Sequence, residues 1–273
     1  LSLGIQDFDA TVQKACNRMQ SAEEVQTLVD ASRSAGVRSI SFDLIYGLPH
    51  QSVESFDRTL DTVIAMRPDR FAVYNYAHLP QRFKGQRMIN ADDIPAPETK
   101  LDLLHHTIDK LCGEGYVYIG MDHFALPDDE LVAARRDGTL QRNFQGYSTH
   151  SNCDLVGLGV TSIGMVGPTY SQNLRDIDDY YAAIDGGHLP IQRGLALSAE
   201  DRLRRDVITR LICHFRLDMQ QLGEQWGIDF HAHFAAELAK LAGMEQDGLL
   251  RINGEVIEIA PRGRFLIRNI CMV

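Results

Sequence analysis

Residues 39–76, SISFDLIYGLPHQSVESFDRTLDTVIAMRPDRFAVYNY, decide the fold. A run rich in β-branched and aromatic residues opens the stretch at 39–45, and a similar run closes it at 70–76. Between them, Ser52 can cap a helix with one apolar face, and Pro68 ends that helix. Two strands joined by a helix pair in parallel through a right-handed crossover. The stretch therefore predicts an α/β fold, either an open sheet or a βα barrel.

The same pattern continues on both sides of this stretch. Residues 2–5 resemble the end of a buried strand, and Ser21 with Glu24 forms a capping box for a helix that ends at Gly36. A helix is expected over 98–111 and a fourth strand over 116–119, followed at once by GMDHFALPDDE. Residues 141–167 predict short strands and tight loops, whose glycines either admit a ligand or simply form bulges and turns.

From Ser198 the pattern becomes mainly helical. We expect helices over 198–213, 219–226 and 231–241, a β-hairpin around Asn253-Gly254, and a last helix opened by Pro261. This predicts two domains, an α/β part over 1–197 and a helical, winged-helix-like domain over 198–273. A winged helix suggests DNA binding, but HAHFAAELAKL at 231–241 offers one Lys and no Arg, Asn or Gln to read bases. A small accessory domain or lid is the preferred interpretation.

Composition narrows the class of protein. Apolar residues make up 44 % and charged residues 23 % of the 273 residues, which is typical of a folded globular chain. The net charge of −10 disfavours binding to nucleic acid or to an anionic membrane. Without a long apolar run, a signal peptide or paired cysteine motifs, we expect no membrane insertion, a cytoplasmic location and no disulfide framework. Because the sequence starts at Leu1 within a strand pattern, we expect a piece of a longer protein.

Polar residues near the carboxyl ends of the predicted strands are the first candidates for a ligand site. Gln6 follows the first strand, and Asp43 lies between Phe42 and Leu44 in the second. A carboxylate in such a run either binds a ligand hydroxyl or a cation, or forms an ion pair with Arg18. Asp122 and His123 follow the fourth strand and can do acid–base chemistry, bind a carboxylate, or merely stabilise a loop.

Metal and nucleotide motifs are weak or missing in the sequence. His105 and His106 are adjacent on a helix, and His231 and His233 are two residues apart, so each pair points to different faces. The sequence has no G-x-G-x-x-G, P-loop, G-x-S-x-G or H-E-x-x-H motif.

Longer strings carry a family resemblance. LSLGIQDFD, FDLIYGLP, YNYAHLP, GMDHFALPDDEL, RNFQGYSTH and RFLIRNICMV together resemble the oxygen-independent coproporphyrinogen III oxidases, which are radical S-adenosylmethionine (SAM) enzymes of haem synthesis. GMDHFA, NFQGY and RNICM separate this family from the haem-chaperone-type relatives. The resemblance implies part of a partial (βα) TIM-like barrel of the radical SAM type, followed by an additional domain.

The resemblance also implies a reaction. Two propionates of coproporphyrinogen III become vinyls, giving protoporphyrinogen IX and carbon dioxide, after a 5′-deoxyadenosyl radical from SAM removes a hydrogen atom. The family uses a 4Fe-4S cluster, an electron donor and two SAM molecules. A haem-binding radical-SAM-like protein without decarboxylase activity is the alternative, and a nucleic-acid-binding regulator is a more distant one.

Family SAM contacts correspond to five positions of this sequence. The resemblance implies that Arg18 binds the methionine carboxylate, and that Gln6 and Asp43 bind ribose or amino groups. It implies that Ala77 and Ile163 pack on adenine, with Ile163 at the second SAM.

The resemblance does not extend to the family's cluster-binding cysteine motif. The family's C-x-x-x-C-x-x-C cluster motif lies upstream of the position equivalent to Leu1, so we expect no cluster ligands in this chain and no catalysis by it alone. Asp122 and His123 are our candidates for substrate contact. Arg142, Arg175 and Arg268 can each meet a propionate, and the sequence does not choose among them.

Overall fold

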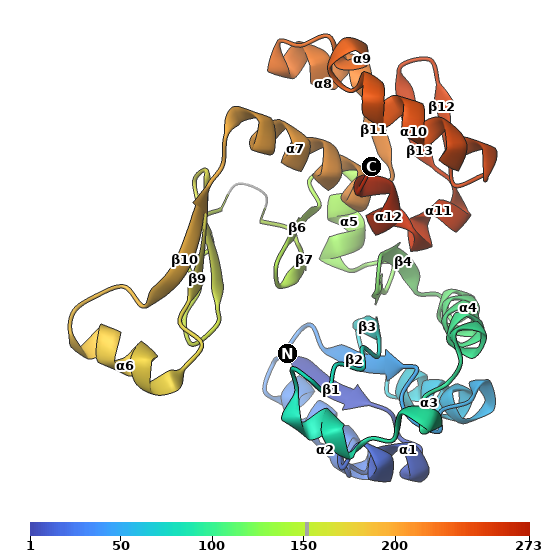
Figure 1. The fold of residues 1–273 in the computed structure, drawn as a ribbon. Helices are drawn as coiled ribbons and strands as arrows, with labels where there is room; N and C mark the ends of the chain where they lie inside the picture. Colours follow the sequence, from blue (N-terminus) through green and yellow to red (C-terminus); the bar gives the residue numbers. More distant parts are fainter. Residues whose placement is uncertain (151–152) are drawn as a thin grey trace. The chain divides into compact units, whose positions relative to one another are not determined.

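The computed structural model describes residues 1–150 and 153–273, which form two compact units, 1–133 and 134–273. We describe each unit by itself (Figure 1). This division lies earlier in the chain than the predicted domain boundary at 197/198. The reason is that residues before 197 pack within the second unit: the Tyr147 hydroxyl donates to the Ile212 carbonyl oxygen at 3.3 Å, and Arg205 contacts the Met165 sulfur at 3.7 Å.

The first unit is an α/β sheet with helical crossovers. Its strands lie in the order β1-β2-β3-β5-β4, and β1, β2 and β3 are parallel, as the sequence predicts. The capping box expected at Ser21 is present, and Ser52 caps its helix as expected, forming a capping box with Ser55. The elements are β1 Ser2–Gln6, α1 Ala10–Ala15, α2 Ala22–Ser34, β2 Ser41–Tyr46, α3 Val53–Ala65, β3 Arg70–Asn75, 3₁₀ helices Lys84–Met88 and Ala91–Asp93, α4 Pro97–Gly113, β4 Val117–Gly120 and β5 His123–Ala125, with α5 Glu130–Arg136 crossing into the second unit.

The fourth predicted strand does not continue the parallel sheet. Instead, β4 pairs antiparallel with β5, which in turn pairs antiparallel with β3. The chain reverses immediately after β4 because Gly120 and Met121 adopt φ values of 150° and 51°, in the region that glycine favours. His123, which the sequence places after the fourth strand, opens β5.

One face of this sheet forms the core. Leu3, Phe42, Phe71 and Phe124 are neighbours across four strands, and the Phe42 and Phe71 rings meet edge to face with centroids 6.2 Å apart. The three phenylalanines are almost fully buried. Burying side chains of this size contributes roughly 1.5–3 kcal/mol each. The alternation of β2 therefore turns the side chain of Asp43 to the opposite face.

The second unit combines small sheets with helices. Its sheets are β6-β7, β10-β9-β8 and β11-β13-β12. The predicted β12–β13 hairpin forms, but its turn residues are Gly254 and Glu255, one position after the predicted Asn253-Gly254, because Asn253 pairs with Val256. Figure 1 shows α6 at the end of the ribbon formed by β9 and β10. The elements are β6 Gln141–Asn143, β7 Gly146–Ser148, β8 Ile163–Val166, β9 Thr169–Asn173, α6 Ile177–Asp185, β10 Ile191–Ala196, α7 Ala199–His214, β11 Arg216–Asp218, α8 Met219–Trp226, α9 Phe230–His233, α10 Ala235–Gln246, β12 Leu250–Asn253, β13 Val256–Ile259, α11 Pro261–Phe265 and α12 Ile267–Cys271.

Two of the predicted C-terminal helices are divided. The third ends at His233 and resumes at Ala235, and the last is split at Leu266 into α11 and α12. Among the described helices, none is long and apolar enough to cross a bilayer.

Candidate functional site

The sheet of the first unit has a polar face opposite its core. In register, Gly4 pairs with Asp43, Asp43 with Ala72, and Ala72 with His123, so these four residues form one row across the sheet. Neighbouring strands are about 4.8 Å apart, which puts the backbones of Asp43 and His123 about 10 Å apart. Only the small Ala72 lies between them. The row therefore brings together two residues that the sequence analysis selected separately.

The side chains of Gln6 and Arg18 lie next to Gly4, one of the residues of this row. A Cβ atom at Gly4 would lie 2.8 Å from Nε2 of Gln6 and 3.2 Å from Nη2 of Arg18. The same Nη2 atom donates a 2.7 Å hydrogen bond to the Gly4 carbonyl oxygen. The two side chains thus occupy the space that a larger residue would fill, beside the strand position that pairs with Asp43.

Asp43 is half-buried and has one hydroxyl partner. The Ser2 hydroxyl donates to its carboxylate at 3.1 Å. Burial raises the pKa of Asp43 above its ordinary value, and the Ser2 hydrogen bond partly opposes that rise. The alternative ion pair between Asp43 and Arg18 does not form among the described residues, because Arg18 binds the Gly4 carbonyl instead. The carboxylate is left available to a polar ligand.

Gln6 has an unusual backbone. Its φ of 67° is left-handed, and the β1–β2 register shifts between Gly4 and Gln6. Such a conformation costs about 1–3 kcal/mol in a residue other than glycine. The side-chain Oε1 atom of Gln6 is buried without a hydrogen-bond partner among the described residues. A buried acceptor of this kind calls for a donor, so it indicates a ligand with N–H or O–H groups.

Asp7 anchors the strained end of β1. Its carboxylate accepts hydrogen bonds from the Thr59 hydroxyl at 2.6 Å and from Nε2 of Gln51 at 2.5 Å. Gln51 in turn accepts the Gly47 N–H at 2.5 Å. Desolvation raises the pKa of Asp7 despite these donors. Sequence reasoning missed this network; its signal was an acid directly after a buried strand, which resembled an ordinary loop residue.

A pocket of about 470 Å³ opens beside this network. Gln6 and Arg18 line it, as do Tyr76 and Gln86, whereas Asp43 does not. Ala77 lies next to the pocket lining, and its carbonyl oxygen accepts a 3.0 Å hydrogen bond from Gln86. The carboxyl ends of β1 and β3 therefore border one cavity.

Asp122 and His123 lie at the start of β5. The Asp122 carbonyl oxygen accepts the Val73 N–H at 2.7 Å, and His123 meets the Tyr74 ring edge to face, with centroids 6.1 Å apart. Burial and the charge of Asp122 raise the pKa of Tyr46 to about 12. Asp122 is thus close to Tyr46, the last residue of β2. β2 is the strand whose Asp43 pairs with both Gly4 and Ala72.

The other predicted residues belong to the second unit. Ile163 begins β8 and pairs with Gln172 of β9. Thr161, two residues before Ile163, has a left-handed φ of 62°. Arg142 lies in β6 and is partly buried, whereas Arg175 and Arg268 are exposed.

Metal ligands are dispersed among the described residues. All five cysteines are free, and no group of three His, Cys, Asp or Glu residues within 1–150 and 153–273 could hold a metal ion. His231 and His233 bind different carboxylates, those of Glu255 and Glu200, each at 3.0 Å. The donor set among these residues does not fit an iron–sulfur cluster.

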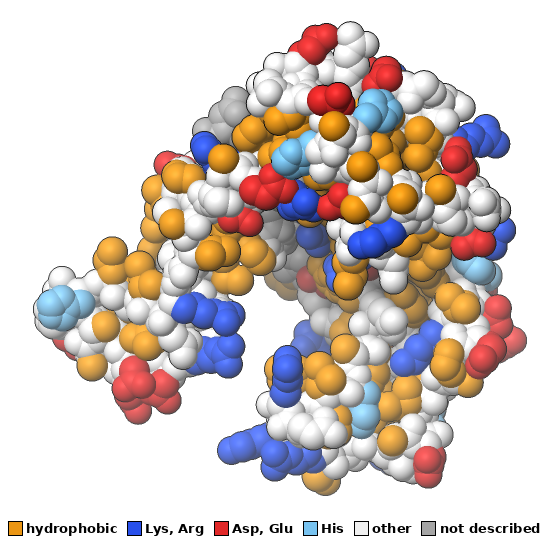
Figure 2. Space-filling model, turned by 45° about the horizontal axis from the view of Figure 1, so that its top comes forward, with side chains coloured by type: hydrophobic (Ala, Val, Ile, Leu, Met, Phe, Trp, Pro, Cys, Tyr) orange, Lys and Arg blue, Asp and Glu red, His pale blue; other side chains and the backbone are white. Residues whose placement is uncertain are grey.

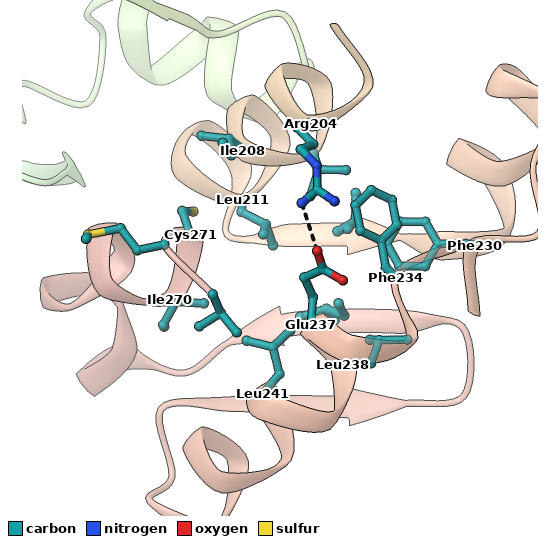
Figure 3. Close-up of a pocket in the computed structure, with 15 residues that line it drawn as sticks. Arg204, Ile208, Leu211, Phe230, Phe234, Glu237, Leu238, Leu241, Ile270 and Cys271 are labelled. Atoms are coloured by element: carbon teal, nitrogen blue, oxygen red, sulfur yellow. Dashed lines mark hydrogen bonds and ion pairs between the residues drawn. The ribbon is translucent and has the colours of Figure 1, made fainter. Parts of the chain in front are cut away.

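A second pocket, of about 210 Å³, lies within the C-terminal helices. Figure 3 shows its apolar walls and the Arg204–Glu237 ion pair, at 2.8 Å, reaching across it. None of the predicted site residues lines it. Around it, Figure 2 shows acidic and basic side chains interspersed over the helices at the top of the view, without a continuous basic patch on that face.

Comparisons with known proteins agree on one family. The family model described as HemN C-terminal domain matches residues 197–266. Oxygen-independent coproporphyrinogen III oxidases from Pseudomonas aeruginosa and Escherichia coli are 56 % and 48 % identical over the whole of this chain, which covers 59 % and 60 % of their lengths. The relative from Thermostichus vulcanus is 44 % identical, and the chain covers 84 % of it.

A solved structure agrees with these sequences. Coproporphyrinogen III oxidase from E. coli, described as a radical SAM enzyme, is similar with a TM-score of 0.97 at 48 % identity. The similarity covers all of this chain and 63 % of that one. The chain thus spans about three fifths of the length of the first relatives that it matches.

Proposed function

Because this chain belongs to the family of oxygen-independent coproporphyrinogen III oxidases, we propose that it supplies SAM-binding and substrate-binding residues for the conversion of coproporphyrinogen III to protoporphyrinogen IX. We also propose the finer fold assignment: the parallel strands as part of a partial barrel of the radical SAM type, and residues 198–273 as a winged-helix-like domain. The cytoplasmic location stays a prediction.

One observation carries the proposal. Gln6 and Arg18 fill the space over Gly4, beside Asp43, and the buried Oε1 atom of Gln6 lacks a partner among the described residues. A cation, an anion and an amide so close together match a zwitterionic ligand with hydroxyl groups. SAM has a carboxylate, an amino group and a ribose. The residues present therefore fit SAM.

Each residue has a proposed role. The Arg18 guanidinium binds the methionine carboxylate, while Asp43 and Gln6 bind amino or ribose groups. Ala77, an exposed residue two positions after β3, packs on adenine. Ile163 contacts a second SAM. Bound SAM would supply a 5′-deoxyadenosyl radical that abstracts hydrogen from a propionate β-carbon.

The chain's own groups then act on the substrate. We propose that Asp122 and His123 contact the porphyrinogen. His123 lies in the same sheet row as Asp43, so a substrate held by it would face the SAM-binding residues. An electron donor is also expected. Because the described cysteines do not form a ligand set, we assign no step to a cluster on this chain and expect no SAM cleavage by it alone.

Binding of S-adenosylhomocysteine, measured by calorimetry, tests the proposal. Arg18→Gln and Asp43→Asn should each weaken binding at least about tenfold, equivalent to about 1.4 kcal/mol. Arg38→Gln is the matched control, because Arg38 is exposed in the same unit. Equal affinity in all four proteins would contradict the assignment.

Two rival functions give different results. A haem-binding protein would bind haem tightly and show no porphyrinogen turnover when supplied with the remaining parts of the enzyme. A nucleic-acid-binding regulator would show salt-dependent affinity for DNA. The interspersed charges on the C-terminal helices in Figure 2 do not favour the second.

A further inference from the structure

Cationic side chains from two elements lie at the end of α7. The guanidinium carbon of Arg264, in α11, lies 4.8 Å from the centre of the Phe215 ring, and Phe215 is the C-cap of α7. The guanidinium carbon of Arg142, in β6, lies 5.7 Å from the centre of the Tyr147 ring. Tyr147 in turn donates to the Ile212 carbonyl in the last turn of α7. Two aromatic rings thus hold two guanidinium groups at one helix end.

These guanidiniums differ from other arginines of the unit. Arg204 and Arg210 bind carboxylates at 2.6–2.9 Å. By contrast, the Nε atoms of Arg142 and Arg264 are buried without a hydrogen-bond partner, and neither group forms an ion pair with any carboxylate of the described residues. A buried cation without a counter-ion is costly, so these two groups indicate an anion that binds there.

Two further basic side chains lie close to these guanidiniums. Burial, together with the charge of Arg264, lowers the pKa of Arg135, at the end of α5. Burial and the charges of Arg210 and Arg135 likewise lower the pKa of His214, although a backbone hydrogen bond opposes this. Repulsion of this kind requires guanidiniums close to one another.

The end of a helix attracts cations by itself, because its last carbonyl groups carry partial negative charge. That explanation predicts hydrogen bonds from the guanidiniums to those carbonyls. The buried Nε atoms make none. Stacking on a ring also fixes the plane of a guanidinium, which prepares its fork of N–H groups for a carboxylate.

We propose that Arg142 and Arg264 form a carboxylate-binding site at the end of α7, and that its ligand is a propionate group of the tetrapyrrole. The identity of the ligand rests on the proposed function. This choice also separates Arg142 from Arg175 and Arg268, the exposed alternatives that the sequence left open.

Titration of the protein with coproporphyrin III, followed by absorbance, tests the site. Arg142→Gln and Arg264→Gln should each weaken binding at least about tenfold, and Arg264→Lys should give an intermediate loss because it keeps charge without the fork. Arg251→Gln, an exposed arginine in β12, is the matched control and should bind like the wild type. The tetramethyl ester of coproporphyrin III should bind weakly to every protein. Unchanged binding of coproporphyrin III in the Arg142 and Arg264 variants would contradict a propionate as the ligand of this site and leave the proposed function standing.

A second probe separates the two proposals. Glutarate carries carboxylates without a tetrapyrrole, and it should raise the thermal midpoint of the wild type and of Arg251→Gln but not of the double variant Arg142→Gln/Arg264→Gln. If glutarate gives this result and the wild type does not bind coproporphyrin III, the carboxylate site is supported and the proposed substrate is contradicted. Failure of both probes to distinguish the variants overturns the site.

Discussion

Nε2 of Gln51 donates a 2.5 Å hydrogen bond to the carboxylate of Asp7, 44 residues earlier in the chain. The Asp7 side chain is only 2 % exposed. This bond fastens the YGLPHQ turn after β2 to the end of β1, directly beside Gln6. The conformation of the candidate site therefore depends on a buried acid that is not itself expected to touch the ligand.

Thr59→Val should destabilise the protein by about 1.5–3 kcal/mol at neutral pH, because it removes a hydrogen bond to the buried Asp7 carboxylate and one from the Phe8 N–H. The first of these hydrogen bonds lowers the pKa of Asp7, so the deficit should shrink as pH falls and the carboxylate becomes protonated. Urea unfolding at several pH values measures this loss of unfolding free energy. Thr62→Val, whose exposed hydroxyl binds only the Arg58 carbonyl, is the control and should change stability little. A deficit independent of pH would contradict the role of the Asp7 charge.

Gly4→Ala should separate stability from ligand binding. The added methyl group meets the mobile ends of Gln6 and Arg18 rather than backbone, so the free energy of unfolding should change by less than about 1 kcal/mol. Binding of S-adenosylhomocysteine should nevertheless weaken at least about tenfold, because both side chains are displaced. Calorimetry beside urea unfolding checks this pair of outcomes. Equal losses in both measurements would point to a purely structural glycine.

Gly263→Ala should be strongly destabilising. A Cβ atom there would lie 1.8 Å from the backbone carbonyl oxygen of Leu249, which cannot move aside cheaply. Overpacking of this kind costs about 1–3 kcal/mol or more. Gly243→Ala, within α10 and with open space around it, should instead stabilise by up to about 1 kcal/mol. Urea unfolding of the two variants compares them directly, and a similar result for both would refute the packing argument.

Stability should fall in alkali because of buried tyrosines. Burial raises the pKa of Tyr116 to about 12 from an ordinary value of 10.0, and its hydroxyl donates to the Pro68 carbonyl at 2.8 Å. The folded state therefore holds this proton more tightly, so its contribution is complete below pH 10 and is lost as pH approaches 12. Tyr116→Phe should cost about 1 kcal/mol at neutral pH and flatten this decline. Tyr181→Phe, at a residue that is 57 % exposed, should leave the decline unchanged.

Alkylation of native thiols should follow burial. Cys213 and Cys271 have their pKa raised to about 12 by desolvation, so little thiolate forms at neutral pH. Cys153 is exposed and should react first with iodoacetamide. Mass spectrometry of the peptides measures the order in which the cysteines are alkylated. Early modification of Cys213 would show that the core of the second unit opens readily.

The parallel part of the fold could be predicted from local signals. Capping residues and apolar spacing located α2 and α3 to within about two residues, and the runs of β-formers located β2 and β3. The reversal after β4 could not be predicted in this way. It depends on the left-handed backbone of Met121, a residue that rarely adopts that conformation, and the sequence resembles a loop there.

The candidate site was predictable residue by residue but not as a set. A lone Asp43 among apolar residues and a polar Gln6 after a strand are visible locally. That Gly4 brings Gln6 and Arg18 beside Asp43 depends on strand register and on the bulge in β1, which no spacing along the chain encodes. The unpaired Nε atoms of Arg142 and Arg264 likewise appear only after packing.

The pairing of strands also sets an order of events in folding. The β12–β13 hairpin is closed by the turn at Gly254-Glu255, and contacts so near in sequence form within about 1–10 μs. The β1–β2 pair joins residues about 40 positions apart and needs α2 in place, so it must form later. The first unit, which carries the candidate SAM site, is therefore expected to acquire its native structure more slowly than the hairpin of the second. Rapid-mixing hydrogen exchange should show protection at Glu258, whose N–H faces β12, before protection at Asp43, whose N–H faces β1.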